Sequence, residues 1–305
     1  IRYMEKRSVP SALLFALFGA FATNMRISGL FFFGLAGVIY LVHITTQKEW
    51  NKKNLLLCVL ALCAFVGFYL ALTPGTWSGP AKFLRYIFAR SANFSDWPGY
   101  VYYMGKACRP VPWHYIPVMI ALTTPPLIVF LMLAGNIAAV VNAFRIKLSA
   151  LFSGRAQYIL LSMLFVWAFL GYTMIRQPIL YDSWRHFYFL AGLLYVLAAY
   201  GLEQLISLLK GRWKWVGIGA VGLQLLAMLV IVVMSHPFQF VYYNQLAGTN
   251  PGERYDLDYW NVSQAQALMQ LVDQVDPDET ITVTATDWYT GDGLDKAYSI
   301  LPASY

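Results

Sequence analysis

The sequence predicts an all-α, polytopic membrane protein with about seven transmembrane helices and a small outer α+β piece at its C-terminal end. Of the 305 residues, 59% are hydrophobic and only 12% are charged, whereas a soluble domain averages about 25% charged residues. The apolar residues also gather into long runs. Charge is unevenly placed: residues 1–235 hold 20 Lys and Arg against 5 Asp and Glu, and residues 236–305 hold 2 against 10.

The apolar runs define the predicted spans, because a helix needs about 20 apolar residues to cross a bilayer. The first run is short, and Arg26 separates it from the second, so it is either a short crossing or half of a helical hairpin. The fourth run is long and contains Pro125 and Pro126, which remove backbone donors and predict a kinked or broken helix. The runs cover residues 10–23, 27–45, 55–72, 115–143, 158–173, 187–209 and 215–234.

The short loops on one side of the predicted membrane domain are basic. Three Lys or Arg residues occur in each of the segments 1–7, 45–53, 145–155 and 210–214. This density indicates the cytoplasmic side. Seven crossings then put Arg26, the long loop 73–112, residues 175–186 and the tail on the outer side. We therefore expect a transmembrane helical domain over 1–235 and an outer, periplasmic extension over 236–305.

The long outer loop and the tail carry predicted elements of their own. Within loop 73–112, apolar and basic residues alternate at helical spacing over 81–92, which predicts a helix lying in the membrane interface. In the tail, the pattern predicts a helix over 263–275 and a strand over 280–286. We expect the tail to form a small α+β piece resting on the outer face.

The candidate site lies at the lip of the sixth apolar run, where Tyr181, Asp182, Arg185 and His186 stand together. Charge at a membrane border is costly to desolvate and usually has a function there. One interpretation is interfacial anchoring, since Tyr, Trp and Arg are common at membrane borders. The other is a phosphate clamp, in which Arg185 offers a planar fork of donors and His186 a titratable donor.

Other polar residues are expected on the same outer side. Arg26 is either part of a plain turn, with its head group reaching the interface, or a second cation for the site. His236 leads out of the last apolar run through an aromatic segment typical of a membrane border, and is a candidate supporting residue. Asp256 and Asp258 form a carboxylate pair that could hold a divalent metal or an acceptor hydroxyl, although solvated acidic loops are far commoner.

The composition favours a lipid partner. A basic membrane domain suits anionic lipid headgroups, whereas nucleic acid is disfavoured because the chain has no soluble basic domain. The sequence contains no P-loop, GxGxxG or GxSxG motif, and its cysteines have neither metal-ligand spacing nor a disulfide framework. No cofactor is assigned with certainty.

Five segments, in a fixed order, resemble a known family. They are TNMRISGL, DWPGYVYYMGKA, PWHYIPVMIALTTPP, LYDSWRHFYFL, and HPFQFVYYNQLAG with ERYDLDYWNVS. Over about residues 10–275 the chain resembles the C-terminal portion of a bacterial membrane glycosyltransferase of the dolichyl-phosphate-mannose–protein mannosyltransferase-like group, in the GT-C superfamily. The RHF and HP–F–YYN segments contribute most to this resemblance.

The resemblance implies sugar transfer from a polyprenyl-phosphate donor on the periplasmic face of the bacterial inner membrane. In such enzymes an acidic catalytic base lies in the first outer loop. No matching acidic loop precedes the first span here, so the base is expected upstream, in a missing N-terminal half or on an additional chain. The alternatives are a non-catalytic membrane scaffold subunit and a transporter of a lipid-linked sugar. The expected donor-phosphate ligands are Arg185, His186 and Arg26, supported by Tyr181, Asp182 and His236.

Overall fold

The computed structural model is mostly helical and describes residues 6–92, 98–275, 282–284 and 288–299. Within these residues the strands are β1 (Val101–Tyr103) and β2 (Lys106–Cys108), an antiparallel hairpin. The α-helices are α2 (Val9–Met25), α3 (Ser28–Thr46), α4 (Lys52–Leu72), α5 (Pro80–Ala92), α6 (Tyr115–Thr123), α7 (Pro126–Arg145), α8 (Leu148–Leu151), α9 (Gly154–Arg176), α10 (Ala191–Leu208), α11 (Trp213–Met234), α12 (Ser263–Val272) and α13 (Trp288–Ser299). Short 3-10 helices are η1 (Pro74–Thr76), η2 (Arg185–Leu190), η3 (Gln239–Val241), η4 (Gln245–Ala247) and η5 (Pro251–Glu253).

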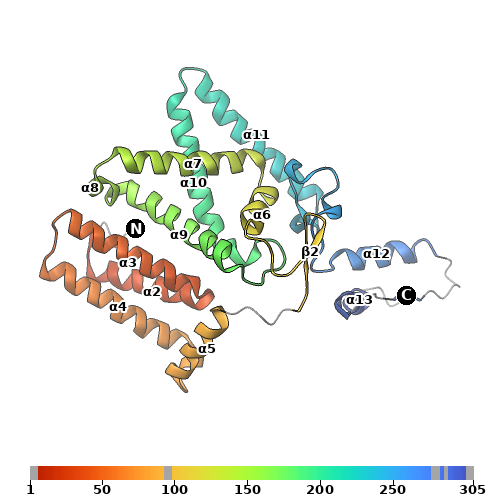
Figure 1. Cartoon of the computed structure of the whole chain (residues 1–305), viewed down its shortest axis with the longest axis horizontal. Coiled ribbons are helices and arrows are strands. Elements are labelled where there is room, and N and C mark those ends of the chain that lie inside the picture. The colour runs from red at the N-terminus through yellow and green to blue at the C-terminus, as the bar shows by residue number, and fades with distance from the viewer. Residues whose placement is uncertain (1–5, 93–97, 276–281, 285–287, 300–305) are drawn as a thin grey trace.

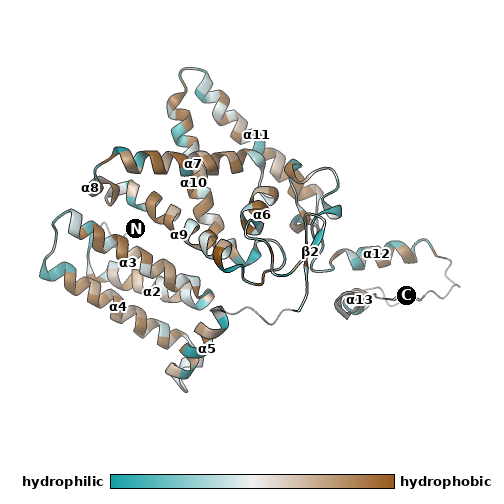
Figure 2. Ribbon diagram, in the orientation of Figure 1, coloured by the Kyte–Doolittle hydropathy of each residue, from teal (hydrophilic) through white to brown (hydrophobic). Residues whose placement is uncertain are grey.

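Among the described residues, six helices are long and apolar enough to cross a membrane, judged by length and composition. They are α3, α4, α7, α9, α11, and α10 together with η2, which precedes it directly. The first predicted run forms α2, which is apolar but has 17 residues. Figure 2 shows the long helices as mostly hydrophobic and the tail as more polar. The structure therefore fits a multi-pass helical membrane protein.

Helices α2, α3 and α4 pack against one another (Figure 1). Ala12, Ala16 and Ala20 recur every four residues along α2 and are fully buried, because small side chains on one face let neighbouring helix axes approach closely. Beside them, Phe33 of α3 stacks on Phe65 of α4 with ring centroids 4.2 Å apart. This packing fixes the turn between α2 and α3, where Arg26 lies.

Helices α7 and α10 cross at a point where both carry glycine. A Cβ atom added to Gly135 would lie 1.9 Å from the backbone oxygen of Leu197, and one added to Gly201 would lie 2.2 Å from that of Leu131. Real Cβ atoms do not approach a backbone atom this closely, so the crossing requires both glycines. It fixes the position of α10, whose N-terminal extension carries Arg185.

The predicted break in the 115–143 run is present, as the gap between α6 and α7. The tail binds the backbone carbonyls that the break exposes. Asn244, which is 3% exposed, donates from Nδ2 to the backbone oxygens of Ala121 at 2.6 Å and Thr124 at 2.5 Å. Its backbone N–H donates to the oxygen of Leu122 at 2.8 Å. The end of α6 thus has hydrogen-bond partners, and the tail is held against the membrane domain.

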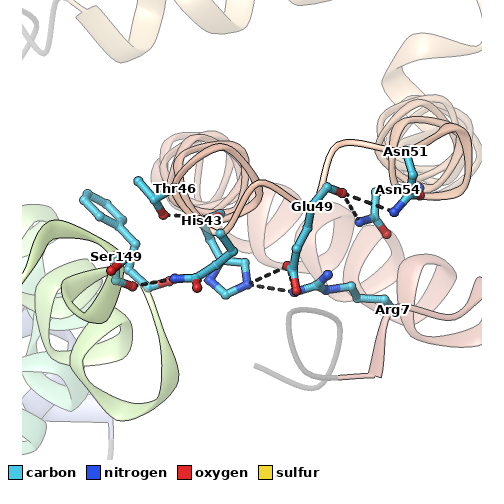
Figure 3. A network of polar contacts seen from close by, with 9 residues as sticks. Arg7, His43, Thr46, Glu49, Asn51, Asn54 and Ser149 are labelled. Atoms are coloured by element: carbon cyan, nitrogen blue, oxygen red, sulfur yellow. Dashed lines mark hydrogen bonds and ion pairs between the residues drawn. The ribbon is translucent and has the colours of Figure 1, made fainter.

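A polar cluster joins the helices at the other end of α2, where α3 ends and α4 begins (Figure 3). Arg7 Nη2 lies 2.5 Å from Glu49 Oε2 and donates to His43 Nε2 at 2.7 Å. His43 Nδ1 contacts the backbone oxygen of Phe152, and Asn54 Nδ2 donates to the backbone oxygen of Glu49 at 2.8 Å. We call Arg7, His43 and Glu49 the Glu49 cluster. It links α2, α3 and α4 to the segment between α8 and α9.

Loop 73–112 and the tail can be compared with the elements predicted for them. The helix predicted over 81–92 is present as α5, and the helix predicted over 263–275 is present as α12. For the strand predicted over 280–286, residues 282–284 have no strand structure, and the rest lie outside the described residues. Helix α11 has no buried residue within the described part of the chain.

Candidate functional site

A cavity of about 590 Å³ lies where η2 leads into α10. Its walls come from the α2–α3 turn, β1, α6, the segment before α10, and the tail after α11. Arg26, Tyr102 of loop 73–112, residues 182–186 and the tail after α11 therefore line one cavity. That these segments lie on the outer side of a membrane stays a prediction. The charged and titratable residues of the lining include Arg26, Asp182, Arg185, His186, Tyr243 and Asp256.

The turn before α10 has an uncommon backbone conformation. Asp182 and Ser183 both have left-handed φ angles, of 56° and 58°, which cost a non-glycine residue about 1 kcal/mol or more each. The next residue, Trp184, is buried and donates from Nε1 to Thr123 Oγ1 at 2.8 Å. Strained turns of this kind cluster at functional sites. Here the turn directs Asp182 and Arg185 to the same cavity wall.

Arg185 is held by one carboxylate and three aromatic rings. Its Nε lies 3.4 Å from Asp182 Oδ2, and the same oxygen accepts a hydrogen bond from Trp260 Nε1 at 3.0 Å. The guanidinium carbon lies 4.4 Å from the ring centroid of Trp260, 4.8 Å from that of Tyr181 and 5.5 Å from that of Tyr259, all within cation–π range. Within the described residues its terminal Nη groups donate no hydrogen bond, so both are left for a ligand.

Arg26 completes the cationic wall, and His186 lies beside the two arginines in the cavity lining. The guanidinium carbon of Arg26 lies 5.5 Å from the ring centroid of Phe189, and no described carboxylate forms an ion pair with it. Burial around its head group, together with the positive charge of Arg185, lowers the pKa of Arg26. The edge of the His186 ring meets Tyr181, with centroids 4.6 Å apart. Two mutually repelling arginines against one carboxylate leave this wall with positive charge in excess, which favours an anion.

Asp182 is the carboxylate of this wall. Burial raises its pKa, while the charge of Arg185 and the hydrogen bond from Trp260 act in the opposite direction. Its ion pair with Arg185 is partly exposed, at 25% for the arginine side chain and 22% for the carboxylate. Asp182 therefore orients Arg185 without enclosing it.

The tail supplies a second carboxylate, Asp256, to the cavity. Its backbone N–H donates to the oxygen of Tyr102 at 3.2 Å, and its Oδ2 accepts from the N–H of Tyr102 at 3.1 Å. Burial raises the pKa of Asp256; the Tyr102 N–H lowers it, and the negative charge of Asp182 raises it further. The cavity is thus polarised, with excess positive charge around Arg185 and a carboxylate on the tail.

The structure separates the carboxylate pair that the sequence analysis considered for a metal. Asp258 caps α12: its Oδ1 accepts from the N–H of Val262 at 2.9 Å, and its Oδ2 accepts from the N–H of Ser263 at 2.8 Å. Asp256 instead lines the cavity. No group of three His, Cys, Asp or Glu side chains suited to a metal occurs among the described residues.

Two of the supporting residues predicted from the sequence lie outside the cavity lining. Tyr181 packs against Arg185 and stacks on Tyr259, with ring centroids 5.4 Å apart. His236 is not brought to the cavity wall; its Nδ1 lies 3.0 Å from Nε2 of Gln239, which does line the cavity. The cavity therefore contains all three predicted phosphate ligands and Asp182, but not His236.

Trp260 and Asn244 are functional candidates that the sequence analysis did not assign. Trp260 contacts both Asp182 and Arg185, and Asn244 fixes the tail to the break after α6. Both lie within segments that carry the family resemblance. No local pattern, however, indicates which distant backbone or side chain they meet.

No protein-family model, curated protein or solved structure matches this chain.

Proposed function

We propose that the chain is part of a glycosyltransferase that takes a sugar from a polyprenyl-phosphate donor, and that the cavity binds the donor phosphate. The observation that carries the proposal is the cationic wall. Arg26 and Arg185 come from segments far apart in the sequence and line one cavity with His186. Among the described residues only Arg185 is ion-paired, with Asp182. An anion between them relieves their mutual repulsion and gives the Nη groups of Arg185 an acceptor.

The same wall suits the chemistry of phosphate departure. When the bond between the sugar and the phosphate breaks, negative charge grows on the phosphate oxygen. Cations already in place stabilise that charge without reorganising. Arg185 is oriented by Asp182 and by aromatic rings before any ligand arrives.

We also propose the arrangement in the membrane. Helix α2 is a seventh crossing alongside the six longer apolar helices, and the basic short loops face the cytoplasm. The cavity and the tail then face the periplasm of a bacterial inner membrane. Helix α5, which carries Lys82, Arg85 and Arg90 beside apolar residues, lies in the interface and guides the lipid tail of the donor.

The acceptor in this proposal is a hydroxyl-bearing molecule in the periplasm. The family resemblance supports an additional acidic loop, supplied upstream or by another chain, that completes the site. A lipid-linked sugar carrier would use the same cations, so transfer distinguishes an enzyme from a carrier.

The proposal is tested by donor turnover in liposomes that contain the full-length protein. Polyprenyl-phosphate mannose and polyprenyl-phosphate glucose are supplied, and release of polyprenyl phosphate is followed. We expect release that depends on Arg185. Specific binding of the donor without release would favour a carrier, and no binding of any polyprenyl phosphate would leave the scaffold role.

A further inference from the structure

Asp256 differs from the other carboxylate of the cavity in its charge partners. Asp182 Oδ2 is ion-paired with Arg185 Nε at 3.4 Å and accepts a hydrogen bond from Trp260 Nε1 at 3.0 Å. Asp256 makes no ion pair with a described residue, although it lines the same cavity. A carboxylate in a partly buried site that no cation neutralises is costly to keep ionised, which indicates that this position has a function.

The backbone around Asp256 fixes the direction of its carboxyl group. Tyr102 binds both its backbone and its Oδ2, and Tyr255 pairs with Tyr103 in an antiparallel bridge. Tyr243 donates from its hydroxyl to the backbone oxygen of Asp256 at 3.0 Å. No described residue hydrogen-bonds to Oδ1. One carboxylate oxygen is therefore anchored, and the other is left to accept a proton.

We propose that Asp256 is the general base that accepts the proton of the attacking hydroxyl, an inference that rests on the proposed function. The acceptor O–H bond breaks, and its proton passes to Asp256 Oδ1. The acceptor oxygen forms a bond to the anomeric carbon of the sugar. The bond from that carbon to the phosphate oxygen breaks, and its electron pair leaves with the phosphate toward Arg185 and Arg26.

The two carboxylates of the cavity thus have different roles. Burial raises the pKa of both carboxylates, which makes each a stronger base than an exposed one. They differ in their partners: Asp182 is ion-paired with Arg185 and positions it, whereas Oδ1 of Asp256 has no hydrogen-bond partner among the described residues. The resemblance to known transferases implies a base upstream of this chain. Asp256 offers a base within the chain itself, on the tail wall of the cavity.

The proposal predicts a defined pH profile. Activity requires the Asp256 carboxylate, so kcat/KM should fall as pH decreases through its raised pKa, above the usual carboxyl value of about 4. The ionisable groups facing Asp256 are Asp182, Tyr115 and Tyr243. Burial raises the pKa of Tyr243, so this tyrosine stays protonated across the range.

Azide provides the sharpest test, because it attacks an anomeric carbon without losing a proton. Full-length protein and its Asp256→Asn variant are given polyprenyl-phosphate mannose or polyprenyl-phosphate glucose, with water or azide as nucleophile. We expect Asp256→Asn to lower release of polyprenyl phosphate about 100-fold with water. Azide should restore release and yield the glycosyl azide. Asp258→Asn, at the α12 cap, controls for damage to the tail.

Each outcome separates this inference from the proposed function. If Asp256→Asn releases polyprenyl phosphate at the parent rate while Arg185→Ala does not, Asp256 is not the base and the phosphate site stands. If azide fails to rescue Asp256→Asn, although the variant still binds polyprenyl phosphate like the parent, the base assignment is wrong. If the parent protein releases nothing from either donor, the proposed function and this inference fail together.

Discussion

Two groups of cations lie at opposite ends of the helices, and they differ in how their charge is balanced. In the Glu49 cluster, Arg7 meets Glu49 at 2.5 Å and also donates to His43 (Figure 3). At the cavity, Arg185 has one carboxylate at 3.4 Å and Arg26 has none among the described residues. Arg7 is thus paired within the protein, whereas Arg26 and Arg185 keep N–H donors that a ligand can use.

The difference separates a structural cation from a ligand-binding one. Arg7 lies between helix ends and joins α2, α3 and α4, so its interactions contribute to packing. Arg26 and Arg185 lie on a cavity wall beside a strained turn, and their repulsion is a cost without an anion. We therefore expect substitutions at the cavity to change lipid-phosphate binding, and substitutions in the Glu49 cluster to change stability.

The largest effect is expected at Arg185. Arg185→Ala should lower polyprenyl-phosphate-dependent turnover about 100-fold, as loss of a preorganised charge donor does in other enzymes. Arg185→Lys should also impair turnover more than folding, since lysine keeps the charge but loses the planar fork. Turnover and thermal unfolding of both variants are measured in the same preparations.

Arg176 supplies the matched control for Arg185. It ends α9 at the same end of the helices, is exposed, and does not line the cavity. Arg176→Ala should leave turnover unchanged. If Arg185→Lys turns over donor at the parental rate and Arg185→Ala is only expressed less, Arg185 is an interfacial anchor. Arg26 would then be the next candidate for the phosphate clamp.

A substitution of Asn244 tests whether a fully hydrogen-bonded polar residue at the cavity end has a structural role, as the residues of the Glu49 cluster do. Asn244→Ala removes two hydrogen bonds to backbone oxygens at the α6–α7 break, which should cost about 2 kcal/mol because buried carbonyls lose their partners. A protease should then cleave the tail of this variant faster than the tail of the parent protein. Gln245 is an exposed neighbour, and Gln245→Ala should leave the cleavage rate unchanged. Equal cleavage rates of Asn244→Ala and Gln245→Ala would contradict the anchoring role of Asn244.

Arg26 should have a smaller effect than Arg185. Its head group is partly desolvated at the cavity, but the residue as a whole is exposed, so water still competes for the head group. Arg26→Gln should weaken polyprenyl-phosphate binding about tenfold, equivalent to about 1.4 kcal/mol. Affinity is measured in lipid nanodiscs at low and high salt. An unchanged affinity at low salt, where exposed charges act most strongly, would remove Arg26 from the site.

The smallest effect is expected in the Glu49 cluster. Glu49→Gln should lower the free energy of unfolding by about 1 kcal/mol or less, because the Glu49 side chain is 38% exposed and solvent screens its ion pair. Lipid-phosphate affinity should not change. A loss of affinity comparable to that of Arg26→Gln would show that the two clusters do not have separate roles.

The sequence predicts much of the fold because membrane crossing depends on local properties. Apolar run length is enough to identify six helices, and Pro125 and Pro126 are enough to place the break between α6 and α7. Crossing parity then brings Arg26 and Arg185 to one end. Segment 280–286 shows the limit of short-range alternation, since residues 282–284 form no strand.

The site is predicted only in part, because its remaining contacts join segments far apart in the sequence. Arg185 and His186 are identifiable from their position at the lip of an apolar run. Asp256 and Asp258 are two residues apart and look like a pair, yet one enters the cavity and the other caps a helix. Trp260 reaches Asp182 across 78 positions, and no local pattern specifies such a contact.

The most direct test of the cationic wall compares binding of polyprenyl phosphate with binding of the uncharged polyprenol of the same length. Full-length protein in nanodiscs is titrated with each lipid, alongside Arg185→Ala and Glu49→Gln. We expect the parent and Glu49→Gln to bind the phosphate at least tenfold more tightly than the alcohol, and Arg185→Ala to bind both alike. Equal affinity of the parent for both lipids, or full retention of phosphate preference by Arg185→Ala, would contradict this expectation.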